Sequence, residues 1–198
     1  IEKYKADYGV FRELLEKFES AGLIRREISD VSNNWNPELN LGISYRDFFY
    51  DERVIFPIRD EQNKLLGFAG RKTKDSKYPK YLYTPGLPKA SILYRSHEAF
   101  QKTTESVKNI TQPILYICEG LLDCLRLEEL GHAAVAVLGS NLSDHQSKII
   151  IDYANSLPEK YSLKVKIFFD RDNAGLKGAA NSIEKLLIND ILLRIEPS

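Results

Sequence analysis

The 198-residue sequence has no methionine, one tryptophan and two cysteines, and 28 basic residues balance 28 acidic ones. Because the net charge is zero, composition alone does not indicate nucleic-acid binding; only a local clustering of charge would. No apolar run approaches the roughly 18 residues of a membrane span, and no signal-peptide pattern opens the chain. We therefore expect a cytoplasmic protein with no membrane partner. Because the chain begins with Ile1 and lacks methionine, we expect it to be a piece of a longer protein.

The scarcity of cysteine also bears on metal binding. Cys118 and Cys124 lie six residues apart and form no C-x-x-C pair, which disfavours a zinc site. We expect both to be small buried apolar side chains in a reducing compartment.

The first half of the chain has mixed local patterns. Apolar residues at three- to four-residue spacing predict that residues 1–28 are helical, with Gly22 as a stop, and 29–44 is rich in Asn, Ser and Pro and predicts a loop. Two apolar runs, 53–58 and 65–71, flank a polar turn and predict a β-hairpin.

A basic and aromatic stretch follows the hairpin. We expect 72–90 to be an irregular surface segment and 96–108 to be a short helix. With a boundary near Gln112, we expect a small α+β subdomain over 1–112 and a second domain over 113–198.

The second domain alternates short apolar runs with helical patterns. This alternation predicts an α/β fold, with a parallel sheet flanked by helices and joined by right-handed crossovers. The expected elements are strands over 114–118, 133–138 and 165–169, and helices over 121–130, 144–155 and 175–187, with Ser143 as the N-cap ahead of Gln146.

Acidic residues follow two of these strands. Glu119 comes directly after the first strand and Asp123 one helical turn later, whereas Asp170 and Asp172 follow the third strand. Ligands of such sheets bind beyond the carboxyl ends of the strands. Clustered carboxylates repel one another unless a cation neutralises them, and oxygen ligands suit Mg²⁺. The pattern predicts a site for Mg²⁺ or Mn²⁺ that positions phosphates.

A structural interpretation of these acids stays open beside the functional one. An acid after a strand is often only a helix N-cap or a first-turn residue favoured by the helix dipole. For Glu119 alone the two interpretations are equally good. The pair Asp170 and Asp172 favours the functional one, because both clusters fall at the same edge of one predicted sheet.

These motifs resemble a known family. The run Glu-Gly-x-x-Asp at 119–123, a strand ending Leu-Gly-Ser at 138–140, and Asp-Arg-Asp-Asn-Ala-Gly at 170–175 are similar to the TOPRIM domain. That domain occurs in bacterial DnaG-type primases, topoisomerases and small nucleases. The upstream runs 51–60 and 67–71 narrow the resemblance to the primase polymerase core.

The resemblance implies an RNA polymerase core that makes primers on single-stranded DNA from NTPs, using divalent metal. It implies that Glu119, Asp170 and Asp172 are catalytic and that they bind metal together with Asp123. The family has a ridge of basic residues that contacts the phosphates of the template and the nucleotide. The residues that match it in this sequence are Arg71, Lys80 and Lys89. A replicative helicase would be a further partner, through regions outside this chain.

The sequence departs from the family pattern in several places. Leu121 and Leu122 replace the usual aromatic residue and methionine, and Ser140 stands where threonine is usual. A strand over 191–195 is expected, but the Asp-rich third motif that follows it in primases is not present before the chain stops. The zinc-binding domain that normally precedes this region is also absent.

Two other functions stay open at this stage. The first is a TOPRIM nuclease or topoisomerase, although no nucleophilic tyrosine of a separate domain is evident. The second is a non-catalytic nucleic-acid-binding module of a mobile-element or phage replication protein. Two interpretations of the basic and aromatic stretch 72–90 stay open as well. It is either a nucleic-acid track, in which cations meet phosphates and aromatic rings stack on bases, or a solvated surface loop with tyrosines packed on the hairpin.

Overall fold

The computed structural model describes residues 2–28, 43–187 and 193–195. Contacts along the chain divide it into two compact units. The first comprises residues 1–58 and 66–87, and the second comprises residues 59–65 and 88–198. Among the described helices, none is long and apolar enough to cross a membrane.

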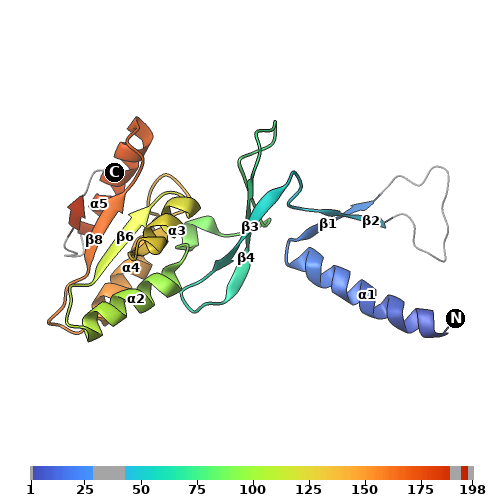
Figure 1. Ribbon diagram of the computed structural model, residues 1–198, viewed down its shortest axis with the longest axis horizontal. Helices are drawn as coiled ribbons and strands as arrows, with labels where there is room; N and C mark the ends of the chain where they lie inside the picture. The colour runs from blue at the N-terminus through green and yellow to red at the C-terminus, as the bar shows by residue number, and fades with distance from the viewer. Residues whose placement is uncertain (1, 29–42, 188–192, 196–198) are drawn as a thin grey trace. The chain divides into compact units, whose positions relative to one another are not determined.

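The first unit opens with a helix and a two-stranded sheet. Helix α1 (Glu2–Ser20) ends at the turn containing Gly22, and β1 (Ile24–Ile28) then pairs antiparallel with β2 (Ile43–Asp47). Figure 1 shows α1 along one side of this strand pair. The prediction of a helix up to residue 28 is thus wrong for residues 21–28, which form a turn and then β1. Most of the loop predicted over 29–44 lies outside the described residues.

A second sheet completes this part of the chain. Strands β3 (Arg53–Arg59) and β4 (Leu65–Lys72) confirm the predicted hairpin, and β5 (Tyr81–Tyr83) adds to β4. The sequence predicted an irregular segment over 72–90, so β5 is a correction. It forms because Ala69, Gly70 and Arg71 of β4 offer a free edge to a three-residue strand.

The second unit is an α/β layer structure. Its sheet has the order β7-β6-β8-β9, and all three pairings are parallel, as the alternating pattern predicted. Its elements in chain order are η1 (Lys89–Ser91), α2 (Ser96–Lys108), β6 (Ile114–Cys118), α3 (Leu121–Glu129), β7 (Ala133–Ala136), α4 (Asp144–Ser156), β8 (Lys164–Phe168), α5 (Asn173–Leu187) and β9 (Leu193–Ile195).

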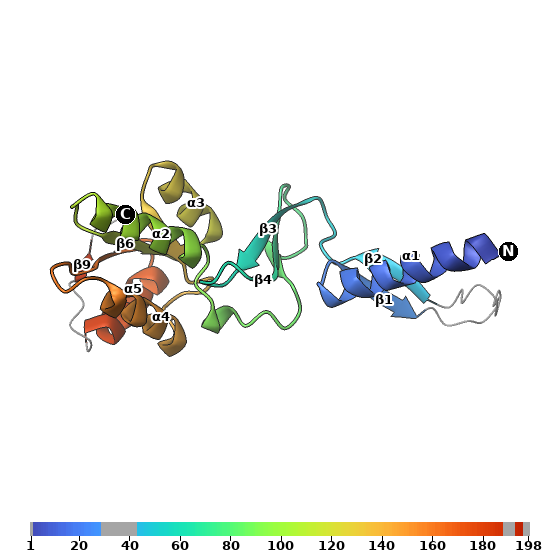
Figure 2. The same ribbon diagram turned by 90° about the horizontal axis from the view of Figure 1, so that it is seen from below.

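Helices cover both faces of the parallel sheet. In Figure 2, α3 lies on one face and α4 and α5 lie on the other. The main core forms where side chains from β6, β7 and β8 meet the helices, and Leu115, Ile117, Val135 and Val165 are fully buried there. Both cysteines are also fully buried, as predicted.

A buried amide fixes the start of α4. The predicted capping box is confirmed: the Ser143 hydroxyl accepts from Gln146 N–H, and Gln146 Oε1 accepts from Ser143 N–H. Gln146 Nε2 also donates to the carbonyls of Lys89, Ile92 and Val137, at 3.1, 2.6 and 2.9 Å. One side chain therefore ties η1 and the segment after it to the end of β7.

Candidate active site

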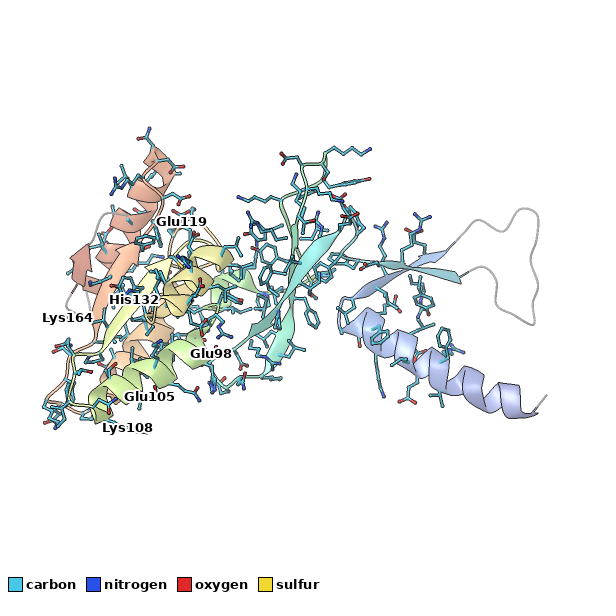
Figure 3. The ribbon with its side chains drawn as sticks, viewed as in Figure 1. Glu98, Glu105, Lys108, Glu119, His132 and Lys164 are labelled. Atoms are coloured by element: carbon cyan, nitrogen blue, oxygen red, sulfur yellow. The ribbon has the colours of Figure 1, made fainter. Side chains whose placement is uncertain are left out.

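The predicted acids lie at one edge of the parallel sheet. Glu119 directly follows β6 and Asp123 sits in the first turn of α3, whereas Asp170 and Asp172 connect β8 to α5. Because β6 and β8 are parallel neighbours, their carboxyl ends meet. In Figure 3, Glu119 lies at the end of the sheet far from Lys164, the first residue of β8.

A backbone contact joins the two acidic motifs directly. Asp170 N–H donates to Glu119 Oε1 at 3.2 Å, across 51 residues of sequence. The Asp172 carboxylate accepts from Gly175 N–H at 2.8 Å, in the manner of an N-terminal helix cap. Asp172 therefore caps α5, as the structural interpretation expects. It also lies at the same sheet edge as Glu119, as the functional interpretation expects.

Two glycines of α5 allow this close approach. A Cβ added at Gly175 would lie 2.1 Å from the Asp170 carbonyl oxygen and 2.9 Å from Glu119 Oε1. One added at Gly178 would lie 1.8 Å from the Ser140 carbonyl oxygen. Only a residue without a side chain fits at these positions, so α5 packs directly on the loops that follow β8 and β7. Sequence reasoning noted the first glycine only as part of a motif and missed the second.

The site raises the pKa of Glu119 above its ordinary value. Burial is the largest cause, because it penalises the charged carboxylate, and the carboxylates of Asp170, Asp172 and Asp123 add to it. The Asp170 N–H acts in the opposite direction, since it stabilises the charged form. A nearby cation would relieve this repulsion.

The donor chemistry of the edge suits a hard divalent cation, because its ionisable ligands are all carboxylates. In this conformation, however, the described residues include no group of three or more His, Cys, Asp or Glu side chains arranged to hold a metal ion. Glu119 and Asp172 each engage one oxygen with a backbone N–H. The carboxylate side chains are of a type that binds a divalent ion. To hold one, however, more than two of these carboxylates would have to turn toward a common point by side-chain rotation.

The predicted basic residues fall in both units. Arg71 and Lys80 line a hollow of the first unit, together with Lys72 and Lys74. Arg71 Nε is buried without a hydrogen-bond partner, and its guanidinium lies 5.9 Å from the centre of the Tyr81 ring. Lys80 is exposed. Lys89 is exposed on η1 of the second unit, where the acids also lie.

Comparisons with known proteins bear on both units. A family model described as the N-terminal domain of the DNA primase catalytic core matches residues 11–100, and a Toprim-like model matches residues 116–196. The DNA primase of Campylobacter jejuni is 33% identical over 149 residues, which cover 74% of this chain. The chain belongs to the DnaG-type primase family. The matched region spans only 22% of the Campylobacter jejuni primase, so the chain corresponds to one part of a full-length primase.

Solved primase structures have the same fold. The zinc-binding and RNA polymerase domains of the Aquifex aeolicus primase match with a TM-score of 0.67 at 27% identity, covering 98% of this chain and 42% of that one. The RNA polymerase domain of the Mycobacterium tuberculosis primase, solved in complex with double-stranded DNA, matches with a TM-score of 0.62 at 21% identity. This match covers 93% of this chain and 53% of the Mycobacterium tuberculosis chain, and at this identity it is evidence for a shared fold only. The predicted α/β TOPRIM fold preceded by an α+β part is confirmed.

Proposed function

We propose that this chain is the polymerising part of a DNA primase, which makes RNA primers on single-stranded DNA by divalent-metal-dependent nucleotidyl transfer. The observation that supports the proposal most is the meeting of two acidic motifs at one sheet edge, through the Asp170–Glu119 contact, in a chain of the primase family. Residues 1–112 would serve as the template- and nucleotide-facing subdomain, and residues 113–198 as the TOPRIM domain.

In this proposal the acids divide the work. Glu119, Asp170 and Asp172 are the catalytic residues, and Asp123 joins them in holding Mg²⁺ or Mn²⁺. The bound ion would supply positive charge that stabilises developing charge on the phosphates. The Asp170 N–H orients the Glu119 carboxylate. The pKa of Glu119 is raised first by burial and then by the neighbouring carboxylates, and a bound cation would stabilise the charged form against both.

The basic residues would bind the substrates. Arg71 has a buried Nε that still lacks an acceptor, and a phosphate or backbone oxygen of a bound nucleotide would provide one. Lys80 and Lys89 are exposed cations that would contact phosphates of the NTP or the template. A replicative helicase in the cytoplasm would bind the whole protein through regions outside this chain.

The first test is metal binding by calorimetry. We expect the wild-type chain to bind Mn²⁺ and the variant Asp170→Asn/Asp172→Asn to lose that binding. The control is Asp152→Asn, which removes an exposed carboxylate of α4 and should leave binding intact. Equal binding by all three proteins would contradict the assignment of these acids.

The second test is template-dependent incorporation of labelled NTPs by the chain and by the longer protein. We expect Glu119→Gln to abolish synthesis without unfolding the protein. Near-normal synthesis by Glu119→Gln would show that the assigned role is wrong. Binding of single-stranded DNA without any metal-dependent product would instead favour a non-catalytic module, and nicking of plasmid DNA would favour a nuclease.

A further inference from the structure

Two cysteines flank the acidic edge of the second unit, and the proposed mechanism uses neither. Cys118 ends β6 and directly precedes Glu119, whereas Cys124 lies near the start of α3 and directly follows Asp123. They are the only two cysteines in the sequence, so an intramolecular disulfide in this chain would have to join them. Both proposed metal ligands of this segment therefore have a thiol as a neighbour in the chain.

The two thiols lie close together. Cys118 Sγ is 3.3 Å from the carbonyl oxygen of Val135, and Cys124 Sγ is 3.3 Å from that of the adjacent residue Ala134. A hydrogen bond between the two thiols is the largest cause that raises the pKa of Cys118, ahead of burial. Both side chains are fully buried. The two sulfur atoms are thus already neighbours in the reduced protein.

A disulfide would have to move one of these residues, because its sulfur atoms are about 2.05 Å apart, closer than two hydrogen-bonded thiols. Cys118 is the fixed partner, since it is paired with Ala136 of β7 on one side and with Phe168 of β8 on the other. Cys124 is held less firmly. The N-cap of α3 is Gly120, which offers no side-chain hydrogen bond, and its carbonyl accepts from Cys124 N–H at 3.2 Å. We therefore expect the first turn of α3 to shift toward β6.

The proposed metal ligands would move with this turn. The Asp123 carboxylate folds back over Gly120, where an added Cβ would lie 2.5 Å from Asp123 Oδ2. The Glu119 carboxylate accepts from Asp170 N–H at 3.2 Å, across to the segment that follows β8. A covalent ring over residues 118–124 would change the position of both carboxylates relative to Asp170.

A metal ion at this edge would have the opposite effect on the turn. Because both thiols are buried, an oxidant reaches them only when the first turn of α3 opens locally. An ion held by Glu119 and Asp123 would tie that turn to the end of β6 and oppose its opening. Metal occupancy and disulfide formation would therefore exclude each other, as two linked equilibria do.

We propose that Cys118 and Cys124 are a redox switch, which hydrogen peroxide closes to a disulfide that empties the metal site. One thiol attacks the O–O bond of the peroxide, which gives a sulfenic acid and releases water. The second thiol attacks the sulfenic sulfur, which forms the S–S bond and releases a second water. Two electrons thus pass from the thiols to the peroxide, and a dithiol reductant reverses the bond by exchange. The inference rests on the proposed function in taking Glu119 and Asp123 as metal ligands.

The test compares the reduced chain with the same chain treated with hydrogen peroxide. Mass spectrometry should show a loss of about 2 Da, from the two hydrogen atoms removed, and a cross-link between Cys118 and Cys124. In calorimetry, the affinity for Mn²⁺ should fall about tenfold or more and return after treatment with dithiothreitol. Saturating Mg²⁺, which takes no part in redox chemistry, should slow disulfide formation about tenfold.

A third measurement needs no metal. Hydrogen exchange at the Asp170 amide should be faster in the oxidised chain, because its acceptor on Glu119 has moved. The control variant is Cys124→Ser, which keeps a small polar side chain but forms no disulfide, so peroxide should leave both its Mn²⁺ affinity and its Asp170 exchange unchanged. Cys118→Ala replaces it as the control if circular dichroism shows that Cys124→Ser is unfolded.

Three results would each overturn the proposal: no cross-linked species, an oxidised chain that binds Mn²⁺ as tightly as the reduced chain, or an equal loss of affinity in the peroxide-treated control. If the reduced chain binds no Mn²⁺ while the disulfide forms and Asp170 exchange becomes faster, the switch acts on the turn and the metal assignment of the proposed function fails. If the reduced chain binds Mn²⁺ and no disulfide forms, the proposed function stands and the switch fails.

Discussion

Replacing Gly178 by alanine should destabilise the protein, although alanine is the better helix former. In the interior of a helix, alanine is favoured over glycine by about 0.8–1.0 kcal/mol. At this position, however, the new Cβ would lie 1.8 Å from the Ser140 carbonyl oxygen and 3.0 Å from its carbon. Those are backbone atoms, so neither can rotate away, and forced packing of this kind costs about 1–3 kcal/mol or more. We expect the free energy of unfolding to fall by about 2 kcal/mol.

Urea unfolding followed by far-UV circular dichroism measures this change, provided that the transition is two-state. The control is Asn181→Ala in the same helix, where the side chain is exposed. It should leave stability within about 0.5 kcal/mol of the wild type or raise it slightly. If Gly178→Ala is as stable as the wild type or more stable, then α5 does not pack on the Ser140 backbone as described.

Three further predictions concern polar side chains of the second unit. Because burial and neighbouring carboxylates raise the pKa of Glu119, the wild type should lose stability as pH rises from the ordinary value of 4.5 through the raised one. Glu119→Gln should not show that loss in unfolding curves at acidic and neutral pH. Gln146→Leu leaves buried carbonyls without their donor and should cost about 2–4 kcal/mol in urea unfolding. Ser182→Ala removes the acceptor of Leu142 N–H and should cost about 1–2 kcal/mol, measured in the same way.

The second unit could be predicted from local patterns to within a few residues. Its strands β6 and β7 are short apolar runs, and α4 begins with the clear capping box at Ser143. In the first unit local patterns predicted the β3–β4 hairpin but failed at β1, which forms only by pairing with β2 beyond a segment of 14 undescribed residues, 29–42. The intrinsic strand preference of Ile24–Ile28 is too weak to outweigh the helical spacing of apolar residues that precedes it in the sequence.

In the candidate site, too, the sequence predicts some features and tertiary packing decides the others. Strand ends locate Glu119 and Asp170, and the parallel order of the sheet then brings them together. Sequence cannot reveal that Asp170 N–H turns toward the Glu119 carboxylate, or that Gly178 touches a backbone carbonyl, because both depend on tertiary packing.

The position of β6 in the sheet has a consequence during synthesis. This apolar strand is hydrogen-bonded by β7 on one side and by β8 on the other, and its partner Phe168 follows Cys118 by 50 residues. At roughly 5–20 residues per second, the ribosome takes about 3–10 seconds to supply that partner. For that interval one edge of β6 is an open template for another chain. The nascent chain is therefore exposed to aggregation there until β8 emerges and covers the edge.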